Sequence, residues 1–369
     1  MSNSEKSIFS DELKIFSFNA TSIRGKLFEF NSHFDVFSSQ NDFDVISVTE
    51  TWLNESVYDQ EILFNSDYNI FRRDRNSSTS TKKDGGGVLL AVNSRLASLR
   101  RCDLETNMEI LWVEIRVDVS RSVFLGTVYL PPNSDLSVVS NFDASVDKVR
   151  AEAKSKDSII ILGDFNMSDA VWEHHDDVEY AVCTNSYCVS RKTSAILDCI
   201  ESNELRQHNA LPTCNNRPLD LVLTNDLPAS ISHTDNPVSS THQALEVRVS
   251  LVNKRTFVSS KRNTYNFKKA DFYLIFQLLA CISWSNLDHF DTVNDALSHF
   301  YDIIFAVISD CVPLVQYNVC KYPHWYTSDL IVMIKEKEKA RKRFINCGRD
   351  KCSDDYKSFC ALRTEVKVL

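Results

Sequence analysis

The stretch DSIIILGDFN, residues 157–166, decides the fold class of this chain. Its apolar run ends at Gly163, and the polar residues Asp164 and Asn166 follow. A short apolar run bounded in this way is typical of a buried strand, and glycine permits a close backbone approach at its end. Because Asp164 and Asn166 are two apart, an extended segment can point both side chains into one cleft. A strand followed by an Asx turn is the alternative interpretation.

Other segments share this strand-like character and are separated by turns and helical stretches. In ILWVEIRVDV, residues 110–119, apolar and polar residues alternate with period two, with Trp112 on the polar side. We expect helices near residues 24–40, 135–154 and 192–207. This succession predicts an α/β or α+β domain. The remaining expected strands cover residues 13–20, 42–50, 85–92, 122–130, 218–226 and 244–251.

The composition limits the class of protein. The chain has 369 residues, of which 43% are hydrophobic, so it can bury at least one full core. Its eleven cysteines form no CxxC pair and no signal peptide opens the sequence, so we expect an intracellular protein. The net charge of −9 argues against a uniformly basic coat for nucleic acid, but an acidic protein that binds a hard cation can still present basic loops.

The character of the sequence changes near residue 252. Strand-like alternation stops there, and residues 269–284 and 295–315 have the apolar spacing of helices. The longest apolar run begins at Phe272, contains Gln277 and is too short for a membrane span, so we expect a core helix and no membrane partner. The Lys- and Arg-rich tail predicts a helix capped by Thr327 or Ser328, either with a solvated charged face or with a face for nucleic acid.

Polar residues collect at the ends of the expected strands, where open α/β sheets build ligand sites. DGGG, residues 84–87, does not belong to this set, because no helix follows it and a tight turn explains it better than a phosphate loop. The candidates at or near strand ends are Asn19, Glu50, Tyr129, Asp164, Asn166 and Asp220.

Six segments, of which all but the last contain these residues, resemble a known family when they are taken in order. Together they resemble the endonuclease/exonuclease/phosphatase superfamily, and more closely the apurinic-type endonuclease domain of a jockey-like or CR1-like non-LTR retrotransposon polyprotein. The resemblance covers about residues 10–252. The segments are FSFNATSIRGK, VISVTETWL, GTVYLPPN, ILGDFNMSD, RPLDLVLTND and SSTHQALEV.

The C-terminal sequence extends this resemblance. YPHWYTSDLIVMIKEKEKARKRF and YKSFCALRTEVKVL resemble the segment that joins such an endonuclease to a reverse transcriptase. No polymerase motif follows before Leu369, so we expect a truncated element copy or a fragment. The expected organisation is a flexible N-terminus at residues 1–10, the endonuclease domain at 11–252, and a helical linker region at 253–369.

The resemblance implies a fold, a reaction and partners. The fold is a four-layer α/β sandwich of two packed mixed β-sheets flanked by helices, with Mg²⁺ or Mn²⁺ at one end. The reaction is hydrolysis of a DNA phosphodiester, which leaves the 3′-hydroxyl that primes reverse transcription. Besides DNA, element RNA and a reverse transcriptase domain would be partners in an intact copy, with target cleavage in the nucleus and assembly with RNA in the cytoplasm.

The resemblance also assigns the metal and the attacking water. Glu50 would bind the ion, since Mg²⁺ takes one or two carboxylates and otherwise keeps water and phosphate oxygens. Asn19 would help to order that site. Asp164 would orient or deprotonate the attacking water, with Asn166 beside it and able to contact the phosphate.

The remaining roles concern the phosphate. Tyr129 could donate a hydrogen bond to a phosphate oxygen, although a half-buried strand aromatic is the alternative. Asp220 would fix the tautomer of His242, and protonated His242 would stabilise charge in the transition state.

Two positions depart from the family pattern. The closing motif Ser-Asp-His is here Ser240, Thr241 and His242. Thr21 stands where the apurinic endonucleases themselves place an acidic residue, which their retrotransposon relatives often lack. Loss of such a partner costs about 10- to 100-fold in metal affinity or activity. A weakened nuclease and a catalytically silent nucleic-acid-binding remnant or host-adopted protein therefore both remain open, as does a phosphoesterase of the same superfamily.

We expect contact with DNA from loops around the cleft. FRRDRN, residues 71–76, holds Arg72, Arg73 and Arg75 near the end of a strand. Arginine suits bidentate contact with phosphate and insertion into the minor groove. The alternative is a solvated loop of mixed charge.

Overall fold

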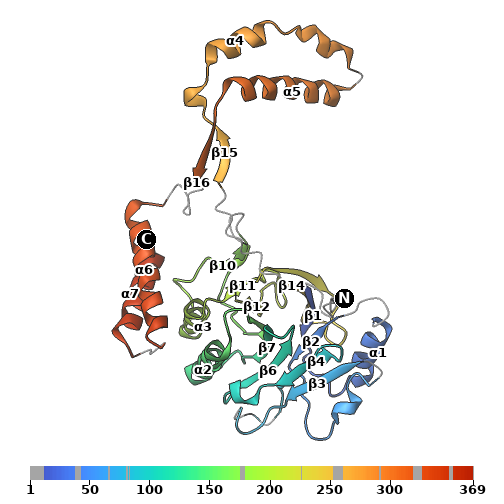
Figure 1. Cartoon of the computed structure of the whole chain (residues 1–369). Coiled ribbons are helices and arrows are strands. Elements are labelled where there is room, and N and C mark those ends of the chain that lie inside the picture. The colour runs from blue at the N-terminus through green and yellow to red at the C-terminus, as the bar shows by residue number, and fades with distance from the viewer. Residues whose placement is uncertain are drawn as a thin grey trace, which may run out of the picture. The chain divides into compact units, whose positions relative to one another are not determined.

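The computed structural model describes residues 12–37, 43–64, 67–79, 82, 84–174, 179–225, 227–251, 261–290, 292–318, 326–348 and 352–368. The chain divides into two compact units (Figure 1). The first consists of residues 1–253 and 336–369, and the second of residues 254–335. The N-terminal segment that the sequence predicts to be flexible, residues 1–10, lies outside the described residues.

Two six-stranded mixed sheets form the centre of the first unit, and every strand expected from the sequence is present in them. β1 and β2 are parallel, as are β7 and β8, while the other neighbours are antiparallel. The first sheet has the order β13 (Ala229–Thr234), β14 (Ala244–Ser250), β1 (Glu12–Asn19), β2 (Val45–Thr49), β4 (Val88–Asn93), β3 (Tyr68–Arg73). The second has the order β11 (Arg206–Gln207), β12 (Asp220–Thr224), β8 (Ser158–Asp164), β7 (Ser122–Tyr129), β6 (Glu109–Arg116), β5 (Ser98–Arg100).

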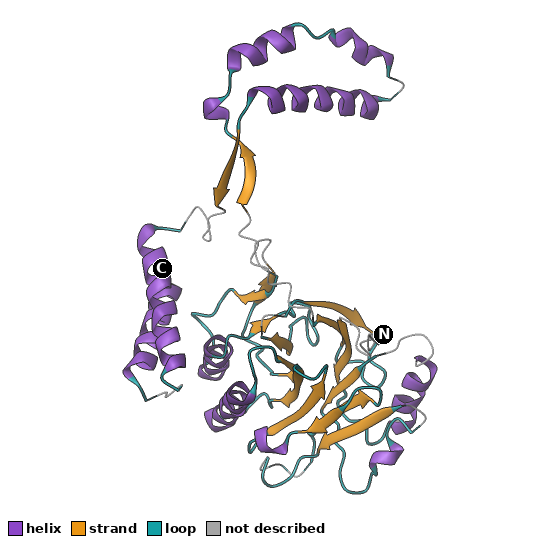
Figure 2. Cartoon of the chain, in the orientation of Figure 1, coloured by secondary structure: helices purple, strands orange, loops and turns teal. Residues whose placement is uncertain are grey.

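Helices cover the outer faces of the sheets (Figure 2). α1 (Leu27–Phe37) packs on the first sheet through Phe30 and Phe34. α2 (Leu136–Glu152) and α3 (Arg191–Ser202) begin at the N-caps Asp135 and Ser190 and pack on the second sheet. Smaller elements are η1 (Asp59–Glu61), η2 (Cys102–Leu104) and the pair β9 (Trp172–His174) and β10 (Ala181–Cys183).

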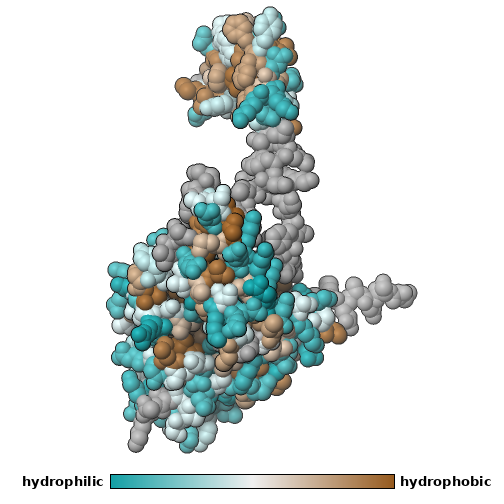
Figure 3. Space-filling view, turned by 90° about the vertical axis from the view of Figure 1, so that its left-hand side faces the viewer, coloured by the Kyte–Doolittle hydropathy of each residue, from teal (hydrophilic) through white to brown (hydrophobic). Residues whose placement is uncertain are grey.

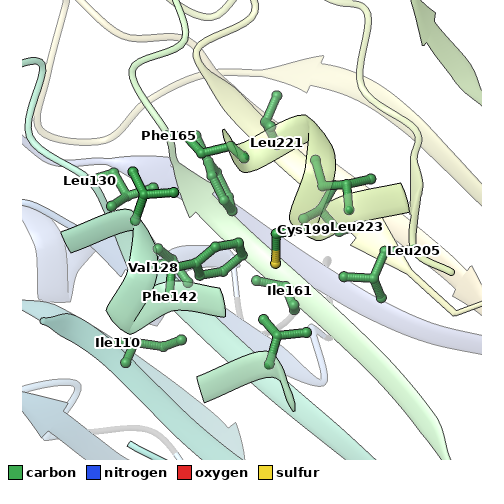
Figure 4. Close-up of a cluster of buried hydrophobic side chains, with 14 of the residues drawn as sticks. Ile110, Val128, Leu130, Phe142, Ile161, Phe165, Cys199, Leu205, Leu221 and Leu223 are labelled. Atoms are coloured by element: carbon green, nitrogen blue, oxygen red, sulfur yellow. The ribbon is translucent and has the colours of Figure 1, made fainter. Parts of the chain in front are cut away.

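Three clusters of buried apolar side chains fill the spaces between these layers. One lies between the two sheets, one between the first sheet and α1, and one between the second sheet and α2 and α3. Figure 4 shows the last of these, where Phe142 from α2 meets Phe165 at a ring-centroid distance of 5.4 Å. The layers therefore run helix, sheet, sheet, helix, which confirms the four-layer α/β sandwich.

The first half of strand β6 is buried on both faces, which corrects the simple alternation read from its sequence; the alternation holds only from Val113 to Arg116. Trp112, on the side expected to be polar, is fully buried and donates its indole N–H to Ser145 Oγ of α2 at 2.9 Å. Gly126 is its partner across the β6–β7 pair. A Cβ atom at Gly126 would lie 2.8 Å from the Trp112 ring. The missing side chain at Gly126 therefore provides the space for this indole.

The C-terminal helices α6 (Ser328–Asn346) and α7 (Asp354–Val368) use some of their basic side chains in ion pairs within the protein. Thr327 Oγ1 accepts from Leu330 N at 3.2 Å, as the sequence predicts for an N-cap. From residue 336 onward the chain belongs to the first unit. Basic side chains of this part pair with acidic residues of α3 and with Glu204, which follows the end of α3. The ion pairs are Lys337 with Glu201 at 2.7 Å, Arg341 with Glu204 at 2.6 Å, and Arg363 with Asp198.

The second unit contains an antiparallel pair, β15 (Lys261–Tyr265) and β16 (Leu314–Asn318), which the sequence did not predict. Its helices are α4 (Phe272–Ala280) and α5 (Val293–Cys311), with η3 (Phe267–Lys269) and η4 (Trp284–His289). α4 is not the core helix that we expected, because Phe272 and Phe276 are 63% and 71% exposed, and apolar side chains appear on the surface of this unit in Figure 3. No helix in the described part of the chain is both long and apolar enough for a membrane span.

Replacement of Gly126 by alanine should destabilise the first unit by about 1–3 kcal/mol, because the added methyl group overpacks against Trp112. Urea unfolding followed by tryptophan fluorescence measures the change. Gly25→Ala is the matched control, since a Cβ atom there meets nothing within 4 Å. Equal unfolding free energies for the two variants would show that the Gly126 contact is unimportant.

Candidate active site

The strand ends that the sequence singled out meet at one place. In the β8–β12 pair Asp164 lies opposite Asp220, and in the β7–β8 pair it lies beside Tyr129. In the other sheet, Asn19 ends β1 and Glu50 directly follows β2. Both sheets thus contribute carboxylates to one site.

Asn19 joins the two sheets through its side-chain amide. Its Nδ2 atom donates to Glu50 Oε1 and to Asp164 Oδ2, each at 2.9 Å. Its Oδ1 atom accepts from the backbone N–H of Thr21 at 2.9 Å, which fixes the orientation of the amide. The two carboxylates are therefore held around a single buried nitrogen.

The two carboxylate oxygens of Asp164 have different partners: Oδ1 accepts from a backbone N–H, and Oδ2 accepts from Asn19. Oδ1 accepts from Asn166 N at 2.9 Å, which is the Asx turn of the alternative interpretation, while the role of the two side chains in a cleft stays a prediction. Asn166 adopts a left-handed φ of 48° and donates from Nδ2 to Leu130 O at 3.0 Å. Gly163 lies so close to β7 that a Cβ atom would be 2.0 Å from Val128 O. Burial raises the pKa of Asp164 well above its usual range, and the negative charge of Asp220 adds to this shift.

This donor set fits a small divalent cation. Two carboxylates that converge repel each other when both are charged, and a proton or a cation relieves that repulsion. Glu50 supplies one of the one or two carboxylates that Mg²⁺ takes, and a bound cation would relieve its repulsion with Asp164. Within the described ranges no three His, Cys, Asp or Glu side chains form a ready metal cluster, so water and substrate would have to complete the shell. The assignment of Glu50 and Asn19 to a metal stays a prediction.

His242 and Asp220 lie beside these carboxylates. The distance from His242 Nδ1 to Asp220 Oδ2 is 3.8 Å, longer than a hydrogen bond, and both atoms are buried without a hydrogen-bond partner. Burial acts to lower the pKa of His242, but the Asp220 carboxylate outweighs it, so that the net shift is upward. The Asp220 carboxylate therefore stabilises the protonated form of His242.

Tyr129 is almost fully buried, with 7% of its surface exposed. Burial, followed by the negative charge of Glu50, raises the pKa of Tyr129 above its usual range. The Arg75 guanidinium lies over the ring at 5.9 Å from its centroid. Tyr129 is therefore a neutral phenol near Glu50, able to donate a hydrogen bond.

The two positions that depart from the family pattern are neighbours in space. Thr21 Oγ1 donates to Ser239 Oγ at 3.1 Å, and Ser239 Oγ is 3.0 Å from Thr241 Oγ1. Thr241 is exposed, while His242 beside it is buried. Three hydroxyl groups thus occupy the rim where the family pattern has carboxylates.

Asn236 is a site residue that the sequence analysis missed. Its Nδ2 atom donates to the carbonyl groups of Asn19 at 3.0 Å and His242 at 2.9 Å. Its Oδ1 atom accepts from Val238 N and Ser239 N at 3.1 and 3.0 Å. The Asn-Pro pair at 236–237 is a turn signal that could have pointed to it. This side chain fixes the loop that carries His242.

Arg72 and Arg73 are engaged inside the protein. Arg72 donates to the carbonyl groups of Val57 and Asn54, and Arg73 to that of Ile110 at 2.9 Å. Their side chains are only 15% and 14% exposed, so the alternative of a solvated loop is wrong for them. Contact of these two arginines with DNA stays a prediction.

Arg75 forms a buried ion pair with Glu109 that the sequence did not suggest. Its Nε and Nη2 atoms donate to the two oxygens of Glu109 at 2.7 and 3.0 Å, and the two side chains are 6% and 2% exposed. The ion pair packs against the backbone of the glycine turn at Gly86. The φ angles of Gly85, Gly86 and Gly87 are 82°, 66° and 85°, which confirms the predicted turn. DNA contact by Arg75 likewise stays a prediction.

Comparison with known proteins gives one family match and several similar solved structures. Residues 123–246 match the family described as endonuclease-reverse transcriptase. The endonuclease domain of TRAS1, a telomere-specific non-LTR retrotransposon, is 13% identical over 65% of this chain and 99% of its own, with a TM-score of 0.47. The AP endonuclease LMAP from Leishmania major is 14% identical over 68% of this chain and 92% of its own, with a TM-score of 0.49. No curated protein matches the sequence.

Replacement of Asp220 by asparagine should lower the pKa of His242, because the neighbouring negative charge that raises it is removed. The sign for stability follows. A histidine whose pKa is raised by folding stabilises the fold below its unfolded pKa, and this contribution is lost as the pH rises through the folded value. NMR titration of the His242 ring in metal-free protein measures the shift. Asp44→Asn, which removes a buried carboxylate paired with Arg95, is the control; an unchanged His242 pKa in Asp220→Asn would contradict the assignment.

Proposed function

We propose that the N-terminal domain is an enzyme of the endonuclease/exonuclease/phosphatase superfamily, and that it is a divalent-metal-dependent endonuclease that nicks DNA. The observation that carries this proposal is the bridge from Asn19 to the carboxylates of Glu50 and Asp164, with Asp220 and His242 beside it. Such a site combines anionic ligands for a cation with a cationic side chain for a phosphate. The family match over residues 123–246 supports this reaction class.

A bound Mg²⁺ or Mn²⁺ supplies Lewis-acid stabilisation of phosphate charge, and Glu50 would hold it while Asn19 fixes the position of Glu50. Asp164 accepts a proton from the attacking water, a task that suits a carboxyl whose pKa is raised toward neutrality. Asn166 holds the Asp164 turn through its backbone N–H.

Tyr129 and His242 would hold the phosphate. Tyr129 stays neutral and donates its phenolic proton to a non-bridging oxygen. His242, kept protonated by Asp220, stabilises the charge that develops in the transition state. The products would be a 5′-phosphate and the 3′-hydroxyl that can prime DNA synthesis.

The biological setting that we propose follows the resemblance stated above. The nick would be made in nuclear DNA and would start reverse transcription of element RNA by a reverse transcriptase encoded by an intact copy. Assembly with that RNA would take place in the cytoplasm.

A catalytically silent nucleic-acid-binding protein is the second candidate. It is favoured by the hydroxyl cluster of Thr21, Ser239 and Thr241. These three side chains carry no negative charge, so they give less support to the ion and its waters than carboxylates would. A phosphoesterase of the same superfamily that acts on other substrates is a further outcome of the test below.

Asp164→Asn should lower plasmid nicking by about 100- to 10,000-fold, since the group that activates water is lost. The assay converts supercoiled plasmid to open circles in Mg²⁺ or Mn²⁺, with chelator as the blank. Asp44→Asn should keep parental activity. Hydrolysis of phosphoinositides or phosphomonoesters without nicking would assign the site to another phosphoesterase, and DNA binding without any hydrolysis would favour the silent protein.

Thr241→Asp should raise nicking over the parent by about 10- to 100-fold, because it restores a negative charge that supports the ion and its waters. Thr241→Asn is the matched control, as it has the same size as aspartate but no charge. Rates equal to the parent for both variants would mean that Thr241 does not limit the activity.

A further inference from the structure

Trp52 stands out among the residues around the site. It lies two residues after Glu50, its side chain is 43% exposed, and its φ angle is 55°. A left-handed conformation is a genuine outlier for a bulky side chain. Strain of this kind persists only where the surrounding structure imposes it, and it concentrates at active sites and ligand clamps.

The glycine turn holds Trp52 in this conformation. Trp52 N donates to Gly86 O at 2.8 Å, and Thr51 N donates to Gly87 O at 3.3 Å. A Cβ atom at Gly85 would lie 3.4 Å from the indole, so the ring rests on the backbone of the turn. The turn thus supports one face of a large aromatic side chain.

The buried Arg75–Glu109 pair makes this support rigid. Gly87 N donates to Glu109 Oε1 at 3.2 Å, and Arg75 Nη1 donates to Asp84 O at 2.8 Å. A Cβ atom at Gly86 would lie 2.3 Å from both partners of the pair. Because Arg75 also lies over the Tyr129 ring, one continuous layer of contacts connects the indole with the site.

We propose that Trp52 stacks on a base or deoxyribose next to the scissile phosphate and so holds the DNA beside Glu50. The inference rests on the proposed function, because it assigns a substrate contact at the same site. An aromatic face suits this task, since stacking on a base that is opened from the duplex, or packing on the apolar face of a deoxyribose, tolerates any sequence. The three nearby arginines are already bonded within the protein, whereas the exposed indole can contact DNA without rearrangement.

DNA binding tests the proposal without hydrolysis. The protein is the full chain with Asp164→Asn, and the probe is a short fluorescein-labelled duplex read by anisotropy. Trp52→Ala should weaken binding about 5- to 150-fold, and Trp52→Phe should recover most of it. Leu99→Ala, which removes an exposed side chain from β5, should bind as the parent does. The duplex should quench the tryptophan fluorescence of the parent, and Trp52→Phe should lose this quenching.

Trp52→Gly separates contact from folding. Glycine accepts the left-handed φ without strain, so this variant should fold at least as stably as Trp52→Ala and still bind weakly. Parental affinity in Trp52→Gly or Trp52→Ala would overturn the proposal. Plasmid nicking by the chain with Asp164 intact is measured separately. If this chain does not nick DNA but replacement of Trp52 still weakens DNA binding, only the proposed endonuclease function is wrong.

Discussion

The site depends on one amide group. Asn19 is fully buried where the two sheets meet, and its two N–H bonds point to carboxylates from different sheets. Without those donors the carboxylates of Glu50 and Asp164 would face each other across a space with little water, where repulsion is strong. The packing of the two sheets brings these carboxylates together, and the hydrogen bonds from Asn19 reduce their electrostatic repulsion. Asn236 donates hydrogen bonds to the backbone carbonyl groups of both Asn19 and His242. The position of the His242 loop is therefore fixed relative to Asn19.

Around this amide the protein keeps polar groups buried. Asp164, Asp220 and His242 are each less than one-tenth exposed, and Asp220 Oδ2 and His242 Nδ1 have no hydrogen-bond partner. Such groups cost stability unless they are paired. The apolar layers on both sides of each sheet offset that cost, so the core stabilises a site that is itself unfavourable. This arrangement is typical of catalytic centres, where charge is held ready for a substrate.

The sequence predicted the eight strands that carry clear apolar patterns, and with them the strand ends that form the site. It missed edge strands such as β13, where ASISHT mixes small and polar residues and is only partly buried. It also missed pairs distant in the chain, because nothing local links Arg75 to Glu109. Arg72, Arg73 and Arg75 also show what local sequence does not contain. Their local charge suggests a contact with DNA, but the tertiary structure gives each guanidinium a partner within the protein. Burial of Trp112 on the expected polar face required knowledge of α2.

Within the second unit, the antiparallel pairing of β15 with β16 places Lys261 opposite Asn318 and Tyr265 opposite Leu314. The helices α4 and α5 therefore lie, along the chain, between two strands that are joined by backbone hydrogen bonds, and the loss of either strand would leave the other without its partner. A fragment that ends near residue 252 would keep both sheets yet lose α6 and α7, and with them the cations that pair with acidic residues of α3 and with Glu204.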